Sequence, residues 1–251
     1  MATDSDHPDS DHPDSGHPDS GHPDSGHPDT GQPDTGQPDT GGHQARPGLP
    51  QPPDVVAATS ADLGPVAEAL ADAFWDDPIL AWILKDESSR SRRLAGLFST
   101  QMRAHYLPLG TVWTTSAPAA GAALWAPPGH ALISPLTTLR FARDLVRALG
   151  RSTARALLSL NRVEHKHPKE PHWYLGVLGT RKAAQGRGIG SALLEPVLER
   201  CDTEGIPAYL ESSKYENLAF YSRHGFAVTG EIALPFGGPT VWPMWRDPRP
   251  R

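Results

Sequence analysis

A cluster of glycines occupies the stretch QGRGIGS, residues 185–191. Apolar residues with helical spacing follow directly, so the cluster lies at the start of a predicted helix. The first backbone N–H groups of a helix have no partner within it, and the helix dipole favours negative charge there. Glycine leaves these groups open to a phosphate oxygen. The stretch therefore predicts a helix N-terminus that binds a pyrophosphate.

Two other phosphate-binding motifs fit this stretch poorly. A P-loop needs a lysine and then a Ser or Thr after its last glycine, whereas Gly190 is followed by Ser191 and Ala192. A dinucleotide-binding fold needs a third glycine where this chain has Ser191 or Leu193. The glycines of such a fold also follow the preceding strand tightly, whereas here five residues separate Thr180 from Gly186. The helix N-terminus alone remains the favoured interpretation.

The same stretch matches the Q/R-x-x-G-x-G/A motif of the GCN5-related N-acetyltransferase (GNAT) superfamily, which binds the pyrophosphate of acetyl-coenzyme A (acetyl-CoA). A predicted strand ending in LGT precedes it, and NLAFYSRHGF at residues 217–226 is similar to a second family segment. The resemblance covers residues 168–246 and is weaker before residue 165. It implies the family's mixed α/β fold (α+β, with a mixed sheet) and acetyl-CoA as cosubstrate.

The resemblance also implies roles for individual residues. Expected cosubstrate contacts are Leu178, Gly179, Thr180, Gln185, Gly186, Arg187, Gly188, Ile189, Gly190, Ser191, Asn217 and Phe220. A backbone N–H of residues 178–180 would stabilise the oxyanion of the tetrahedral intermediate. Tyr221 matches the general acid that protonates the leaving thiolate. Alternatives stay open: a strand-end turn for Gly179, helix capping for Asn217 and core packing for Tyr221.

The acceptor amine needs a base, and Glu211 in the predicted strand 207–213 is the candidate. A structural carboxylate is an equal alternative, because alternation alone does not show which face of the strand Glu211 uses. Ser212 and Ser213 are candidates for the wall of the same site. Asp76 and Asp77 follow the first predicted helix, where they either attract a cationic substrate or, as we favour, lie in a solvated loop. His172 and His224 suit surface or packing roles better than catalytic ones.

Hydrophobic periodicity predicts the elements that position these residues. Expected strands are 54–59, 110–116, 121–127, 171–180, 207–213, 226–235 and 240–246, and expected helices are 62–74, 89–105, one or two within 134–164, one from 189, and 217–225. Pro196 inside the helix that follows the glycines predicts a bend near Ala192. Cys201 lies on the apolar face of that helix, so we expect an inert, buried thiol.

The first 53 residues differ in composition from the rest. A pentad, HPDSG drifting to QPDTG, repeats from Asp6 to about Gly41 without aliphatic or aromatic side chains, which predicts a disordered tail. Its regularly spaced histidines suggest a solvated repeat more than a weak metal site. Before residue 51 lie ten of the 29 acidic residues and one of the 23 basic ones, so the remainder is mildly basic. Such a charge suits an anionic small ligand and is too weak for nucleic acid.

We therefore expect one domain over residues 54–251, with a helical insertion at 134–165 and an acetyl-CoA-binding half at 168–246. The expected activity is direct transfer of an acetyl group to a primary amine of a small molecule, including an antibiotic-like amine. A non-catalytic acyl-CoA sensor and a protein or peptide N-acetyltransferase remain alternatives. Without a signal peptide or an 18-residue apolar stretch, we expect a cytoplasmic protein that does not bind membranes. Monomer and homodimer stay open.

Overall fold

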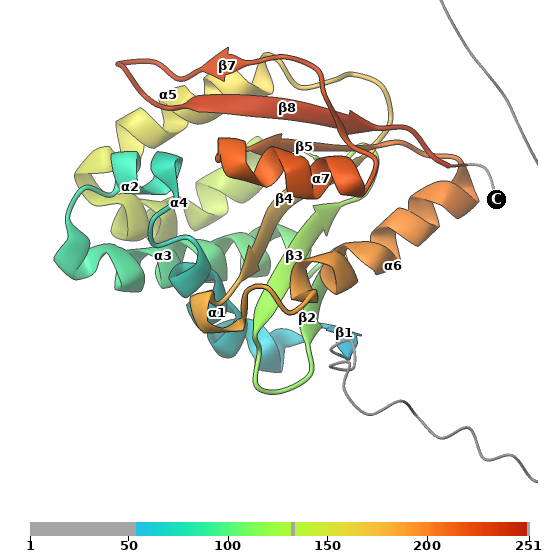
Figure 1. Cartoon of the computed structure of the whole chain (residues 1–251). Coiled ribbons are helices and arrows are strands. Elements are labelled where there is room, and N and C mark those ends of the chain that lie inside the picture. The colour runs from blue at the N-terminus through green and yellow to red at the C-terminus, as the bar shows by residue number, and fades with distance from the viewer. Residues whose placement is uncertain (1–53, 132–133, 250–251) are drawn as a thin grey trace, which may run out of the picture. The chain divides into compact units, whose positions relative to one another are not determined.

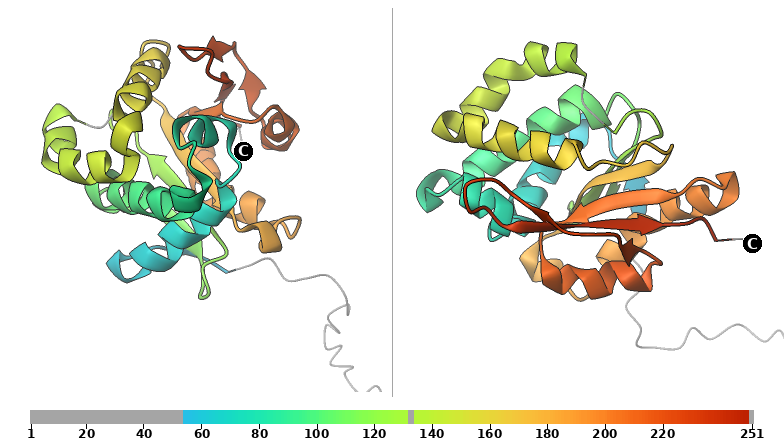
Figure 2. Two further views of the ribbon diagram at one scale, coloured as in Figure 1. Left: turned by 90° about the vertical axis from the view of Figure 1, so that its left-hand side faces the viewer. Right: turned by 90° about the horizontal axis from the view of Figure 1, so that it is seen from above.

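The computed structural model of the chain describes residues 54–131 and 134–249. The predicted tail, residues 1–53, lies outside the described residues. Within them a mixed sheet carries helices on both faces, as the views in Figures 1 and 2 show. The expected mixed α/β fold is confirmed. No helix of the described part is both long and apolar enough to cross a membrane.

The sheet runs in the order β1 (Val55–Ala57), β2 (Val112–Thr115), β3 (Gly121–Ala126), β4 (Trp173–Thr180), β5 (Ala208–Ser212), β8 (Thr240–Arg246) and β6 (Ala227–Val228), and β7 (Ile232–Ala233) pairs with β8. Neighbouring strands are antiparallel except β4 and β5, which are parallel. Strands β2 and β3 form an antiparallel hairpin. The single strand expected at 226–235 is wrong, because this segment forms the two short strands β6 and β7 on either side of a break.

The helices of the described residues are α1 (Leu63–Ala73), α2 (Pro78–Ile83), α3 (Glu87–Gln101), α4 (Pro135–Leu149), α5 (Thr153–Glu164), α6 (Ile189–Glu204) and α7 (Leu218–Arg223). The helix expected at 89–105 begins earlier, because the Asp86 carboxylate accepts the backbone N–H of Ser88 and caps it. It ends as a π-helical turn, η2 (Met102–Tyr106). Helix α2 is too short to show helical periodicity, and the sequence did not predict it.

The two faces of the sheet carry different cores. On β3, Ala122 and Leu124 belong to the core under α1 and α3, whereas Ala123 and Trp125 belong to the core under α6. Successive side chains of a strand point to opposite faces, so this alternation places the two helix groups on opposite sides. Figure 1 shows α6 and the α1–α3 group separated by β3 and β4. The buried Cys201 of α6 lies in the second core, as expected.

The inserted segment forms two helices, α4 and α5, which a short turn joins. Helix α4 packs against α3, and the Arg93 guanidinium of α3 holds its C-terminal end by donating to the carbonyl oxygens of Ala148, at 2.8 Å, and Leu149. After α5 the chain turns and returns to the sheet at β4. This return places residues 165–172 beside the strands that form the site described below.

Candidate active site

Strands β4 and β5 separate part of the way along their length. They pair from Trp173 and Ala208 only as far as Leu175 and Leu210. On its other edge, β4 remains paired with β3 as far as Thr180. The backbone of residues 176–180 therefore has one edge without a strand partner. Apart from the Thr180 carbonyl, which accepts from the Gln185 side chain, the polar groups on that edge are available to a ligand.

A cavity of about 520 Å3 lies at this separation. Its lining is Ala73, Phe74 and Asp77, then Leu175–Thr180 of β4, Ala184–Gly186, Gly188–Ser191 of α6, Leu210–Lys214, and Asn217, Phe220, Tyr221 and Arg223 of α7. Both predicted catalytic residues therefore open into one space. So do all predicted cosubstrate contacts except Arg187, which is exposed and does not line the cavity.

The N-terminus of α6 forms one end of the cavity. Gly186 and Gly188 have φ angles of 76° and 78°, which side chains rarely adopt, so the chain needs glycine at both turns. Gly188 is the N-cap, and it has no side chain to bond the first-turn N–H groups of α6. These groups lack intrahelical partners, so they are free to bind an anion such as a pyrophosphate.

At two other predicted cosubstrate contacts, close packing leaves room only for glycine. A Cβ atom on Gly190 would lie 3.2 Å from the Phe220 ring. A Cβ atom on Gly179 would lie 2.8 Å from Phe74 and 2.9 Å from Ala73, at the end of α1. Gly179 also pairs with Ala122 inside β4, so the strand-end turn considered as its alternative role is wrong. These glycines let α7 and α1 approach the cavity walls closely.

Two polar side chains near the α6 N-terminus already have protein partners. The Gln185 amide donates to the carbonyl oxygen of Thr180 at 3.1 Å and thereby ties the glycine loop to the end of β4. The Ser191 hydroxyl lies 3.0 Å from His224 Nε2. His224 is thus part of the wall behind Ser191, consistent with the packing role expected for it.

Helix α7 supplies a tyrosine hydroxyl to the cavity. Tyr221 is 8% exposed, and burial, with a smaller contribution from the Asp77 charge, raises its pKa above the ordinary value. The hydroxyl therefore keeps its proton at neutral pH, as a general acid must. Asn217 is the N-cap residue of α7, but its side chain makes no capping hydrogen bond. Helix capping does not account for Asn217, whose side chain is available to the cavity.

Glu211 lies on β5 at the edge of the cavity and is itself nearly buried. Its side chain is 6% exposed, and His167 Nδ1 lies 3.3 Å from Glu211 Oε1. The rings of Tyr174 and Tyr209 stand edge-on to the His167 ring, with centroids 4.9 Å away in both cases. The sequence did not assign any role to His167. Three histidines within eight residues before a central strand, at positions 165, 167 and 172, were the available signal.

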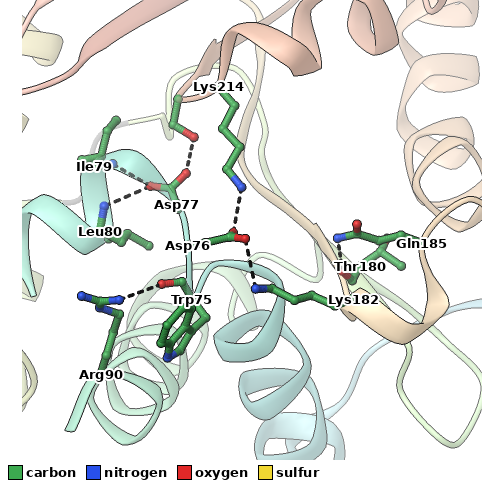
Figure 3. A network of polar contacts seen from close by, with 11 residues as sticks. Trp75, Asp76, Asp77, Ile79, Leu80, Arg90, Thr180, Lys182, Gln185 and Lys214 are labelled. Carbon is green, nitrogen blue, oxygen red and sulfur yellow. Dashed lines mark hydrogen bonds and ion pairs between the residues drawn. The ribbon is translucent and has the colours of Figure 1, made fainter. Parts of the chain in front are cut away.

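Asp77 is 3% exposed, so the solvated loop expected for it is wrong. Its carboxylate caps α2, accepting the backbone N–H groups of Ile79 at 3.1 Å and Leu80 at 3.0 Å, and it also accepts the Ser213 hydroxyl. Figure 3 shows the Asp77 carboxylate beside Ile79 and Leu80. Burial raises the Asp77 pKa, while the hydrogen bonds oppose the rise. The contact with Ser213 joins the segment after α1 to the segment after β5 across the cavity wall.

Asp76 faces two lysines instead of a ligand. Its carboxylate lies 2.8 Å from Lys214 Nζ and 3.0 Å from Lys182 Nζ, as Figure 3 shows. The hydrogen bonds from Lys214 and Lys182 lower the Asp76 pKa to about 2. The charge of Asp76 is therefore balanced within the protein, which weakens the idea that it attracts a cationic substrate.

Comparison with known proteins matches residues 139–226 to the model of the acetyltransferase (GNAT) family. The chain is 30% identical over 189 residues to an uncharacterized N-acetyltransferase of Schizosaccharomyces pombe, covering 69% of this chain and 74% of that one. A Corynebacterium glutamicum structure described as histone acetyltransferase HPA2 and related acetyltransferase has 30% identity, a TM-score of 0.61 and coverage of 80% and 98%. A Drosophila melanogaster polyamine N-acetyltransferase, 15% identical over 77% of this chain and 100% of that one with a TM-score of 0.53, shares the fold.

These relationships agree with the geometry of the site. The family match spans the glycine turns, the parting strands and α7, which together form the cavity. The sequence identity with the yeast relative extends well beyond that core. The chain is therefore an N-acetyltransferase that belongs to the GNAT family.

Proposed function

We propose that the protein transfers an acetyl group from acetyl-CoA directly to a primary amine of a small molecule. One observation carries the proposal. The same cavity contains the open N-terminus of α6, the unpaired edge of β4, Tyr221 and Glu211. An anion site, an oxyanion donor, an acid and a base are the groups that acyl transfer from a thioester requires.

The residues present fit acetyl-CoA as the cosubstrate. The first-turn N–H groups of α6 suit its pyrophosphate, because glycines at 186 and 188 leave the backbone uncovered. The Asn217 side chain, free of a capping bond, suits the amides of the pantetheine arm. Residues 176–180 of β4 offer backbone groups to the arm and to the thioester carbonyl. In this assignment, a β4 backbone N–H stabilises the oxyanion.

The chain's own side chains perform the proton transfers. Glu211 takes a proton from the acceptor nitrogen, and that nitrogen attacks the thioester carbonyl. Tyr221 protonates the leaving thiolate when the tetrahedral intermediate collapses. An acyl-enzyme on cysteine is disfavoured, because Cys201 is fully buried in α6 and burial raises its thiol pKa to about 12.

A small acceptor is favoured over a protein because the part of the cavity near Glu211, where the acceptor amine would bind, is covered on both sides. The Asp77–Ser213 hydrogen bond closes one side, and the turn after α5 places His167 against Glu211 on the other. A peptide chain would need an open groove at this point. The names of related proteins include both kinds of acceptor, since one structure is described as a histone acetyltransferase and another as a polyamine N-acetyltransferase.

A thiol-release screen tests the proposal. The purified chain is mixed with acetyl-CoA and, in turn, with polyamines, arylalkylamines, aminoglycosides, puromycin and lysine-containing peptides. We expect release of free coenzyme A thiol that depends on at least one small amine. Release with peptides alone would identify a protein acetyltransferase. Binding of acetyl-CoA by calorimetry, with no amine-dependent release, would identify an acyl-CoA sensor.

A further inference from the structure

A chain of hydrogen bonds runs from Glu211 away from the cavity. Glu211 Oε1 lies 3.3 Å from His167 Nδ1, and His167 Nε2 lies 3.0 Å from His172 Nε2. His172 Nδ1 in turn lies 2.6 Å from the carbonyl oxygen of Glu170. The side chains of Glu211 and His167 are 6% and 8% exposed, and His172 is 4% exposed. Water has little access to this chain of groups.

The carbonyl oxygen at the far end sets the direction of the chain. A carbonyl accepts hydrogen bonds but cannot donate one, so His172 Nδ1 must carry a hydrogen. Neutral His172 then has a bare Nε2 atom, which accepts the hydrogen on His167 Nε2. Neutral His167 is therefore bare at Nδ1. With an ionised Glu211 and this neutral form of His167, the bare nitrogen faces Glu211 Oε1 with no proton between the two acceptors.

The titratable groups around the pair do not compete with His167 for a proton on Glu211. Burial, with a smaller contribution from the Glu211 charge, raises the pKa of Tyr106, Tyr174 and Tyr209, so all three stay neutral. Burial is the largest cause that lowers the pKa of His172, which favours its neutral form. A proton that reaches Glu211 from the cavity side can thus move only to His167 Nδ1 within this cluster.

We propose that His167 is the final acceptor of the proton that Glu211 takes from the acceptor amine. The inference rests on the proposed function. Glu211, the catalytic residue, forms a bond to the amine proton as the N–H bond breaks, and then passes that proton to His167 Nδ1. The carboxylate is restored, and His167 becomes an imidazolium paired with it. His167 is a positioning residue that acts through Glu211, and it returns the proton through Glu211 to solvent in the cavity when product leaves.

The relay makes the base stronger than a carboxylate alone. An imidazole in water has a pKa about two units above that of a glutamate side chain, which is about a hundredfold in proton affinity. Transfer to His167 makes return of the proton to the amine less frequent, so we expect roughly a tenfold gain in the net rate of proton removal. The acid limb of the pH–rate profile would then follow the Glu211–His167 pair.

The first test replaces the ring of His167 while keeping a polar group at its position. We expect His167→Asn to lower kcat about tenfold and to move the acid limb of kcat to lower pH by more than one unit, with KM for acetyl-CoA unchanged. The matched control is His165→Asn, because His165 is exposed and bonds only a helix carbonyl. An acid limb that stays in place in His167→Asn would overturn the proposal.

The second test does not depend on activity. Nitrogen-15 NMR of the imidazole rings in the full-length protein, with His167→Asn used to assign its signals, reports which nitrogen carries the hydrogen. We expect His167 to be protonated on Nε2 and bare on Nδ1, and His172 to be protonated on Nδ1. A neutral His167 protonated on Nδ1 would refute the relay. A protein with the expected tautomers but without amine-dependent thiol release would instead refute the proposed function.

Discussion

Removing the Asp77 carboxyl should destabilise the fold more than removing its neighbour Asp76. Asp77 is buried and makes three hydrogen bonds, two from the backbone at the start of α2 and one from Ser213. Replacing Asp at an N-cap with Ala costs about 1 kcal/mol. Leaving the Ser213 hydroxyl without an acceptor adds about 1 kcal/mol. For a domain of this size, a total of about 2 kcal/mol corresponds to a Tm lower by roughly 4–8 °C.

The Asp77→Asn variant separates the hydrogen bonds from the charge. Asn is an equally good N-cap, so the bonds to α2 should persist. Burial raises the Asp77 pKa in the folded state, so the ionised form is disfavoured there relative to the unfolded chain. The wild type therefore loses stability as pH rises above the ordinary carboxyl value of 3.8. We expect Asp77→Asn to melt at or above the wild-type Tm at pH 7, with a smaller difference at pH 4.

Thermal melts followed by circular dichroism at both pH values measure these effects. The control is Asp76→Ala, which removes ion pairs of a half-exposed carboxylate and should cost less than about 1 kcal/mol. At pH 7 we expect the highest Tm for Asp77→Asn, a lower one for Asp76→Ala and the lowest for Asp77→Ala. If Asp77→Ala and Asp76→Ala have the same Tm, the buried cap at Asp77 adds no more stability than the exposed ion pairs of Asp76, and the reasoning is refuted.

Three further outcomes follow from the site and its support. Tyr221→Phe should lower kcat by about 10²- to 10⁴-fold while calorimetry still shows acetyl-CoA binding, and unchanged turnover would remove Tyr221 from the acid role. Gly190→Ala should weaken acetyl-CoA binding, because its Cβ meets the Phe220 ring at 3.2 Å, and the double variant with Phe220→Leu should recover affinity in the same calorimetric assay. Arg246 bonds both oxygens of Asp202 and lowers its pKa. The Arg246–Asp202 pair stabilises the fold above pH 3.8, and this stabilisation is lost as pH falls below that value. Wild type and Asp202→Asn should therefore differ in urea midpoint at pH 7 and converge in strong acid.

Local patterns in the sequence predicted most of the secondary structure and the cosubstrate end of the site. Glycines at 186 and 188 marked the helix start, and period-2 and period-3.6 patterns located the strands and helices beside them. These signals are readable because they report interactions between residues close in the chain. The resemblance then supplied the roles, including those of Asn217 and Tyr221, which remain predictions for mutagenesis.

The sequence predicted the short helix and strands, and the part of the cavity near Asp77 and Glu211, less well. Helix α2 and strands β6 and β7 are too short to carry a periodicity, and the buried cap at Asp77 is visible only once Ser213 is placed beside it. The bend that Pro196 predicts in α6 stays a prediction. The sequence predicts the same environment for Asp76 and Asp77, because adjacent carboxylates differ only in what the rest of the fold places around them.

The sequence by itself determined the family pattern, the glycine-rich start of α6 and the position of Tyr221, because each depends on neighbours within one turn or one motif. Only the tertiary structure decided which carboxylates are buried and what they contact. Glu211 meets His167 across 44 residues of chain, and Asp77 meets Ser213 across 136. Contacts over such separations follow from how the strands part and how α4 and α5 return the chain to the sheet, and no local pattern encodes them.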